Sequence, residues 1–325
     1  MARNALAPHA WTGVLLVASS AVLFAFNGVV SKTALQTGLA STHLVAMRTA
    51  GAALILFAAA LVMRPEGLRV TRRQAGALAI LGVVGVALVQ WLYFVAIERL
   101  PVGIALLLEY TAPLMVALWA RFVFGEQVRR RVWLALALSL IGLTMVAQVG
   151  RGASLDAVGI AAALAAAVAL ATYYLLADRM LEGRDPWSTM AWSMGFAAVF
   201  WAILGQPWTI DPALLGSPVV VPETAASLPL WVFVVWIIVL GTAVPYTLIV
   251  LGLTRLGAAR TGLIGTLEPV LAAAFAWMLM AESMSVLQVL GGAVVLTGVL
   301  LAETSRPRAT APVASTSAGA ISPPR

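Results

Sequence analysis

The feature that most constrains this fold is an internal repeat built around a proline-containing apolar segment. Residues 97–143 align without a gap with residues 253–299, each position falling 156 residues before its counterpart. A proline inside a helix costs about 3 kcal/mol in water but is tolerated in a membrane, where neighbouring groups satisfy the freed backbone. Two helices broken at equivalent points predict a site between the two halves of the chain. Identical pairs in the alignment include Arg99 and Arg255, Pro113 and Pro269, and Glu126 and Glu282.

The composition favours a membrane as the surroundings of these segments. The 325 residues are 62% hydrophobic and 10% charged, with a mean hydropathy of +0.99, whereas soluble domains are about 25% charged. The net charge of +7 comes from positive residues in scattered short loops, which does not indicate a nucleic-acid partner. No cysteine is present, so thiol chemistry and disulfides are excluded. The chain is therefore expected to be an all-α membrane protein.

Apolar runs of about 20 residues, the length that crosses about 30 Å of hydrocarbon, recur along the sequence. We expect ten transmembrane helices in two repeats of five, over residues 11–149 and 156–302, and a disordered cytoplasmic tail over residues 303–325. An odd number of spans in each repeat makes the second repeat inverted in the membrane. The expected spans are residues 11–30, 44–63, 74–97, 102–124, 132–149, 158–177, 187–205, 229–252, 258–280 and 285–302.

The orientation follows from the distribution of Lys and Arg between alternate loops. With the N-terminus inside, the inner segments hold fifteen of these residues and the outer segments three. The longest outer connection, residues 206–228, carries Asp211 and Glu223 but no Lys or Arg. Because cytoplasmic loops are enriched in positive charge, both termini are expected in the cytoplasm.

Ionisable side chains inside the hydrocarbon are costly, so each is a candidate functional group. Arg48 lies in the second expected span, Glu109 in the fourth and Glu268 in the ninth. At about 1.5 Å per helical residue, all three lie at depths from which they can face one cavity open to the outer half. The alternatives are that Arg48 snorkels to the surface and that the carboxylates make structural hydrogen bonds or a buried ion pair.

Polar and aromatic residues in the spans add candidates for substrate binding, although such residues also serve as interface anchors and packing groups. Tyr110 follows Glu109, and Tyr246 follows Pro245, a third proline within a span. We expect Pro113, Pro269 and Pro245 to break their helices. The wider set of lining candidates is Asn27, Gln90, Tyr93, Tyr110, Trp119, Tyr174, Trp192 and Tyr246.

Two five-helix repeats, each with a proline in its fourth span and a glutamate thirteen residues later, resemble the EamA-type carriers of the drug/metabolite transporter superfamily. The segments LEYTAPL at residues 108–114 and TLEPVLA at residues 266–272 look like those of the threonine/homoserine exporter branch. The resemblance implies a ten-helix carrier of the inner (plasma) membrane, with a central cavity that opens alternately to each side. It also implies that the fifth and tenth spans are peripheral, where a homodimer contact is one arrangement.

The resulting hypothesis is a secondary transporter that exports amino acids or similar small amphiphilic metabolites and is coupled to protons. A zwitterion suits the candidate residues, because a glutamate can meet its ammonium and Arg48 its carboxylate. The open alternatives are an uptake permease or exchanger on the same fold and a membrane subunit without transport. The motifs HExxH, GxSxG and GxxxxGK[ST] do not occur, and His9 and His43 have no ligand-like neighbours, so neither an enzyme nor a cofactor or metal is expected.

Overall fold

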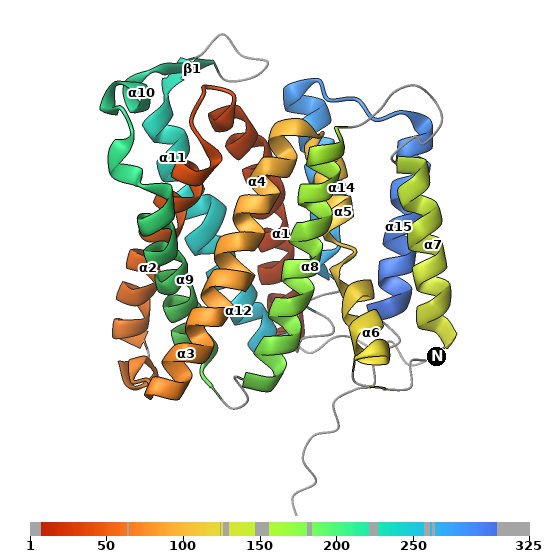
Figure 1. Ribbon diagram of the computed structural model, residues 1–325, viewed down its shortest axis with the longest axis horizontal. Coiled ribbons are helices and arrows are strands. Elements are labelled where there is room, and N and C mark those ends of the chain that lie inside the picture. The colour runs from red at the N-terminus through yellow and green to blue at the C-terminus, as the bar shows by residue number, and fades with distance from the viewer. Residues whose placement is uncertain are drawn as a thin grey trace, which may run out of the picture.

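The computed structural model describes residues 8–63, 65–123, 125, 130–146, 156–180, 184–220, 227–256, 261 and 264–303. Within these ranges the chain is a bundle of helices that run mostly along one direction (Figure 1). Glu126 and the expected tail after residue 303 lie outside the described residues. The side chain of Tyr174 also lies outside the described part of the chain.

The helices follow the apolar runs of the sequence. The first half contains α1 (Pro8–Leu35), α2 (Ser41–Met63), η1 (Pro65–Leu68), α3 (Arg72–Ile80), η2 (Leu81–Leu88), α4 (Val89–Arg99), α5 (Val102–Glu109), α6 (Ala112–Phe122) and α7 (Arg130–Val146). The second half contains α8 (Ala157–Met180), α9 (Pro186–Gly205), η3 (Pro207–Thr209), α10 (Pro212–Gly216), β1 (Pro218–Val220), β2 (Ser227–Pro229), α11 (Leu230–Ile238), η4 (Val239–Ala243), α12 (Val244–Leu256), α14 (Leu267–Met280) and α15 (Val286–Glu303).

Five helical segments of the described chain are long and apolar enough to cross a membrane. Shorter apolar helices accompany them, so the chain is a helical membrane protein, while ten crossings and the inversion of the second repeat stay predictions. The long segments are Trp11–Leu35, Ser41–Met63, Arg72–Arg99, Trp187–Gly205 and Leu230–Leu256. The shorter ones are Val102–Val116, Trp133–Gly142, Ala157–Tyr173, Leu267–Met280 and Val286–Gly298.

Polar residues cap the helices where they leave the apolar runs. The Thr71 side chain accepts a hydrogen bond from the Gln74 backbone, and the Gln74 side chain accepts one in return from the Thr71 backbone, which forms a capping box at the start of α3. Asp185 caps α9 by accepting from the Ser188 N–H at 2.9 Å. These signals agree with helices that begin at the expected inner loops.

The third span of each half contains a π-helix at the same position of the repeat. Segment η2 precedes α4, and η4 precedes α12. Gly85 of η2 and Gly241 of η4 are 156 residues apart, which is the displacement of the repeat. In a π-helix the backbone hydrogen bonds join residues five apart, so its turns are wider than those of an α-helix. Such turns are frequent at functional sites. The sequence indicated neither of them.

The two halves pack against each other through equivalent contacts. Helix α1 packs against α12 and α14, and its counterpart α8 packs against α4 and α5. A Cβ atom on Gly13 would lie 2.8 Å from Cγ of Leu256, and a Cβ atom on Gly159 would lie 2.7 Å from Cγ of Leu100. The first helix of each half therefore packs against the Arg-Leu pair at the end of the third span of the other half. A glycine of the first helix lies at each of these close contacts.

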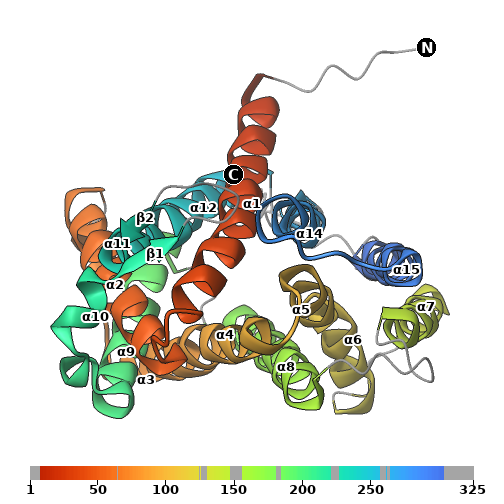
Figure 2. The ribbon, with the colours of Figure 1, turned by 90° about the horizontal axis from the view of Figure 1, so that it is seen from above.

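Helices α5 and α14 bring the two proline segments together at the centre of the bundle. A Cβ atom on Gly103 of α5 would lie 2.6 Å from Cβ of Ala273 of α14, so the two helices touch. Helices α7 and α15 pack on each other at one edge, seen from above in Figure 2. The peripheral place of α7 and α15 agrees with what the family resemblance implies for the fifth and tenth spans.

The connection between α9 and α11 contains structure that the sequence analysis did not anticipate. Strands β1 and β2 form an antiparallel pair in which Val219 faces Leu228. They lie beside α10 at the upper end of the bundle in Figure 1. The β-branched residues of PVV favour a strand, but three residues are too few for an alternation pattern to show it.

Candidate functional site

Arg48 is buried in the interior of the bundle. It lies on α2 with 4% of its surface exposed. Its Nε donates a hydrogen bond to Thr242 Oγ1 at 2.7 Å, and its Nη2 donates a weaker one to the Gly241 carbonyl at 3.4 Å. The guanidinium carbon also lies 5.4 Å from the centre of the Phe94 ring. The guanidinium is thus held by the second half of the chain and does not snorkel to the surface.

Thr242 lies in the π-helix η4, and its hydroxyl takes part in two hydrogen bonds. The Thr242 hydroxyl donates its own hydrogen to the Ile237 carbonyl at 2.7 Å, five residues earlier. Its oxygen is then free to accept from Arg48, since a hydroxyl both donates and accepts. Only some of the five guanidinium N–H groups are used in this way. Among the described residues, none accepts a hydrogen bond from Nη1 of Arg48.

Tyr110 connects the two helix breaks. It follows the last residue of α5, and its hydroxyl lies 2.8 Å from Glu268 Oε2 and 3.1 Å from the Gly265 carbonyl. The single hydroxyl hydrogen can serve one of these acceptors at a time. Gly265 is the repeat counterpart of Glu109. The break in the first half therefore faces the break in the second half across the bundle.

Glu109 and Glu268 share the surroundings of Arg48 but differ in their own partners. Glu109 ends α5 and is 9% exposed, and no described residue donates a hydrogen bond to its carboxylate. Both carboxylates are close enough to act on the charge of Arg48. Neither forms an ion pair with it within 4.0 Å among the described residues. One guanidinium and two carboxylates therefore interact across a gap instead of neutralising one another directly.

Two buried side chains of α1 and α4 lie next to this cluster. Asn27 is 2% exposed and accepts a hydrogen bond from Ser31 Oγ at 3.4 Å. Its Oδ1 lies against Gly241, where a Cβ atom would approach to 2.1 Å. Tyr93 points its hydroxyl at Gly28 of α1 and acts electrostatically on Arg48. The glycines at positions 28 and 241 make room for these polar groups.

Tyr246 lies near the same cluster from α12. Its ring contacts Phe24 edge to face, with ring centres 5.2 Å apart. Its hydroxyl interacts with Arg48, Glu268 and Glu109 through their charges. The sequence candidates that lie close to Arg48 or in contact with one another are thus Arg48 itself, Glu109, Glu268, Tyr110, Asn27, Tyr93 and Tyr246. Their roles in substrate binding or coupling stay predictions.

Pro113 and Pro269 stand in the first turn of a helix, whereas Pro245 lies within the continuous helical span Leu230–Leu256 where η4 passes into α12. Pro113 is the second residue of α6, Pro269 the third of α14 and Pro245 the second of α12. A proline in the first helical turn removes no intrahelical hydrogen bond, because the N–H groups there have no partner in the helix. The breaks at Tyr110 and Thr266 come immediately before these turns. Pro113 and Pro269 therefore each start a new segment after a break, whereas the helical span Leu230–Leu256 continues through Pro245, so the break expected there is not present.

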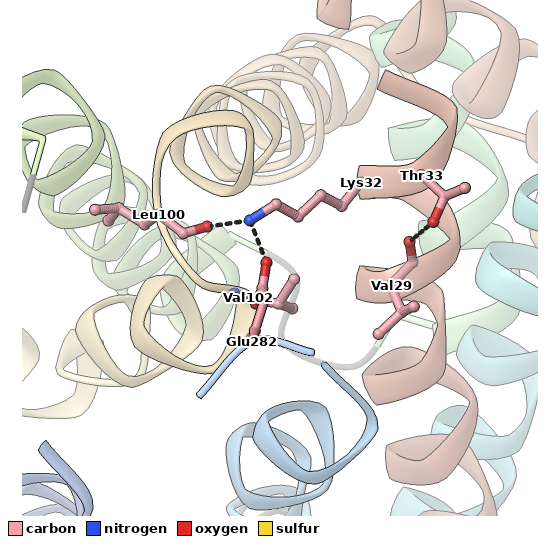
Figure 3. A network of polar contacts seen from close by, with 6 residues as sticks. All are labelled: Val29, Lys32, Thr33, Leu100, Val102 and Glu282. Atoms are coloured by element: carbon pink, nitrogen blue, oxygen red, sulfur yellow. Dashed lines mark hydrogen bonds and ion pairs between the residues drawn. The ribbon is translucent and has the colours of Figure 1, made fainter. Parts of the chain in front are cut away.

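A polar network closes the upper end of the bundle, and Figure 3 shows it from close by. Lys32, at the end of α1, pairs with Glu282 at 2.5 Å and donates to the Leu100 carbonyl at 2.7 Å. Glu282 also accepts a hydrogen bond from the Val102 N–H at 3.0 Å. The side chains of Lys32 and Glu282 are 12% and 15% exposed. We call Lys32, Leu100, Val102 and Glu282 the outer clamp.

The sequence analysis missed the outer clamp. It treated Lys32 as one outer charge and Glu282 as the end of a span. The available signal was that Lys32 is the only lysine of the chain. Pairing across 250 residues depends on how the two halves pack, which the repeat alone does not determine.

The remaining lining candidates have other surroundings. Trp119 on α6 is 46% exposed and borders an apolar pocket of about 290 Å³ between α6 and α8. Trp192 donates to the Leu68 carbonyl at 3.1 Å near the lower end of the bundle. Gln90 is buried beside Tyr246. In the described part of the chain, no group of three His, Cys, Asp or Glu side chains is placed to hold a metal ion.

Comparison with known proteins agrees with this architecture. The model of the EamA-like transporter family matches residues 11–148 and again residues 157–304. The threonine/homoserine exporter RhtA of Salmonella typhimurium is 30% identical over 278 residues, which are 85% of each chain. The Escherichia coli K12 protein of the same name is 30% identical over 260 residues, or 77% of this chain and 78% of that one.

More distant relatives extend the same picture. An uncharacterized inner membrane transporter, YicL of Salmonella typhimurium, is 24% identical over 89% of this chain and 94% of its own. A solved crystal structure of a protein 20% identical in sequence superposes with a TM-score of 0.55 over 93% of this chain and 97% of that chain, which shows a shared fold. Because the family model matches both halves, the chain belongs to the EamA-like transporter family.

Proposed function

We propose that this membrane transporter exports amino acids or similar small amphiphilic metabolites across the inner membrane as a secondary carrier. The observation that supports this most directly is the meeting of the Arg48 guanidinium with the carboxylates of Glu109 and Glu268 inside the bundle. Buried charges that lack a direct partner are costly unless a ligand or a proton neutralises them.

A zwitterion matches this arrangement. The Nη1 group of Arg48 is available to donate to a carboxylate. Glu268 can accept a hydrogen bond from an ammonium group, because the Tyr110 hydroxyl binds its Oε2 and no described residue donates to its Oε1. Two relatives named as threonine/homoserine exporters support an amino acid as the substrate of this chain.

Proton coupling is the second part of the proposal. Glu109 has Glu268 and Arg48 as its charged neighbours, so a proton on Glu109 changes the balance of charge that a substrate meets. In an exporter, a proton that enters from the outside would bind to Glu109 as the substrate leaves. In the proposed alternating-access cycle, the contacts of the outer clamp would keep the upper end of the bundle closed in one state.

The test uses purified protein in proteoliposomes that contain L-threonine, with exchange of external radiolabelled L-threonine as the readout. Replacing Arg48 with methionine keeps an unbranched, flexible side chain but removes the guanidinium and its charge, and we expect half-saturation to shift by roughly 30-fold or more. Arg121→Met is the matched control, because Arg121 is exposed on α6 and its replacement should leave exchange unchanged. Equal exchange by Arg48→Met and wild type would remove Arg48 from the binding site.

An uptake permease or exchanger on the same fold is the alternative to export. Inside-out vesicles with an acidic interior should accumulate L-threonine if the protein exchanges protons for substrate. Right-side-out vesicles in an acidic medium should do so if the protein carries protons and substrate together. Accumulation only in the second arrangement would overturn the direction proposed here.

A further inference from the structure

The side chain of Gln90 is buried without any hydrogen bond. Gln90 is the second residue of α4 and is 5% exposed. Neither its Oε1 nor its Nε2 has a hydrogen-bond partner among the described residues. Buried polar atoms almost always have partners, because leaving one unsatisfied destabilises the folded state. In the described part of the chain, Gln90 is the one side chain with two such atoms.

The position of Gln90 places this free amide at the edge of the candidate site. Gln90 follows η2 in the first half as Tyr246 follows η4 in the second half, and the two residues are 156 positions apart. The Tyr246 hydroxyl lies next to the Gln90 amide, but the geometry falls short of a full hydrogen bond. The same hydroxyl interacts with the charges of Arg48, Glu268 and Glu109. The amide thus faces the group that borders all three charges.

The neighbouring helices hold Gln90 in this place. A Cβ atom on Gly82 would lie 2.4 Å from the Ser193 carbonyl oxygen, so η2 lies directly against the backbone of α9. Trp201 of α9 donates to the Ala87 carbonyl at 3.1 Å, at the end of η2. The turn before Gln90 is therefore fixed by packing and by a hydrogen bond. The backbone that carries the amide is therefore held in place before a ligand binds, which lowers the entropy cost of binding.

We propose that Gln90 binds the polar side-chain group of the substrate and sets a preference for amino acids that carry a hydroxyl or carboxamide. A carboxamide offers two donors and an acceptor, and its natural complement is a group that can both donate and accept. The substrate's α-carboxylate and ammonium would meet Arg48 and Glu268, while its side chain extends toward α4. This inference rests on the proposed function, because it assigns the remaining part of an amino-acid substrate.

The test compares pairs of amino acids of nearly equal shape that differ in the hydroxyl group. Proteoliposomes that exchange radiolabelled L-threonine are challenged with unlabelled L-threonine or L-valine, and with L-homoserine or L-norvaline. Wild type should prefer the hydroxylated member of each pair by roughly 10-fold or more. Gln90→Leu should bring both ratios close to one, mainly by weakening the hydroxylated member.

Stability without substrate supplies a second readout. Gln90→Leu should raise the melting temperature of the purified protein, because it removes two buried polar atoms without partners. Gln288→Leu is the matched control. Gln288 is 8% exposed, and its Oε1 accepts from the Ser285 N–H at 2.9 Å, so its loss should lower the melting temperature and leave both selectivity ratios unchanged.

The outcomes separate the two proposals. If wild type exchanges none of the four amino acids, the proposed function fails, and the side-chain assignment fails with it. If wild type exchanges them and Gln90→Leu keeps the wild-type ratios, the Gln90 assignment alone is overturned. A lower melting temperature for Gln90→Leu would also overturn it, since the amide would then be a structural partner.

Discussion

At the scale of single residues, the two carboxylates have unlike surroundings, although each adjoins the break in a proline helix. Glu268 is held by the Tyr110 hydroxyl at 2.8 Å. Glu109 receives no hydrogen bond from a described residue. A carboxylate with a fixed donor keeps a constant charge that can hold an ammonium group, whereas one without a donor takes up and releases a proton more readily. We therefore expect Glu109 to couple transport to protons and Glu268 to hold the substrate.

Glutamine substitutions separate these roles, because they keep the shape of the side chain but remove its titration and charge. Glu109→Gln should abolish net export driven by a pH gradient while it retains exchange of substrate between compartments. Glu268→Gln should weaken both exchange and net export. Proteoliposome assays with and without a pH gradient measure the difference, after both variants are shown to reach the membrane at normal levels. Wild-type pH dependence in Glu109→Gln would contradict the coupling role.

At the scale of elements, the sequence predicted much of the arrangement that a repeat determines. The displacement of 156 residues marked Pro113 and Pro269 as equivalent, and the structure has breaks just before both. It did not reveal the π-helices, because a wide turn has no strong composition signal in an apolar run. It also did not reveal the pairing of Lys32 with Glu282 or the lack of partners for Gln90. These depend on packing between segments that are distant in the sequence.

The prolines should matter for motion more than for folding. In Pro113→Ala and Pro269→Ala, alanine restores a backbone N–H that can donate to the carbonyl four residues earlier, at Glu109 or Gly265, so the helix can extend back through the break. A continuous helix stiffens the segment that must rearrange, and we expect slower exchange with normal membrane insertion. Stopped-flow or rapid-filtration exchange rates measure the effect. Wild-type rates in both variants would remove the prolines from the mechanism.

The outer clamp is expected to control access from the upper end of the bundle. Val29, one turn before Thr33 on α1, is 3% exposed, and a Val29→Cys variant of this cysteine-free chain supplies a reporter. Lys32→Gln leaves Glu282 without its cation, so the upper end should open more often. We expect faster reaction of the reporter with an impermeant maleimide. The size of the change should be modest, because partly exposed ion pairs contribute about 1 kcal/mol or less.

A charge reversal supplies the control for the clamp. Lys32→Glu combined with Glu282→Lys restores opposite charges, and the labelling rate should fall back toward that of the reporter alone. Lys32→Glu by itself places two carboxylates together and should react fastest. An unchanged labelling rate in all of these variants would contradict a closing role for the pair.

At the scale of the whole molecule, the equivalent contacts of the two halves limit how the carrier can move. Gly13 lies against Leu256 and Gly159 against Leu100, so the first helix of each half is packed on the third span of the other. A change that opens one end must therefore shift both halves together. Equivalent contacts of the two halves could therefore close the two ends of the bundle in turn, as a cycle of alternating access requires.

The orientation of the chain in the membrane is the prediction that can be tested most directly. Fifteen Lys and Arg residues lie in the segments expected inside and three in those expected outside, and positive charge in short loops favours the cytoplasmic side. Single cysteines at Ala153 and Ser217 should react with an impermeant maleimide in intact cells, whereas one at Ser315 should react only after the cells are permeabilised. The absence of native cysteine makes the background low. Labelling at Ser315 in intact cells would contradict both the cytoplasmic C-terminus and the even number of spans, and labelling at Ala153 but not at Ser217 would place an odd number of crossings between them.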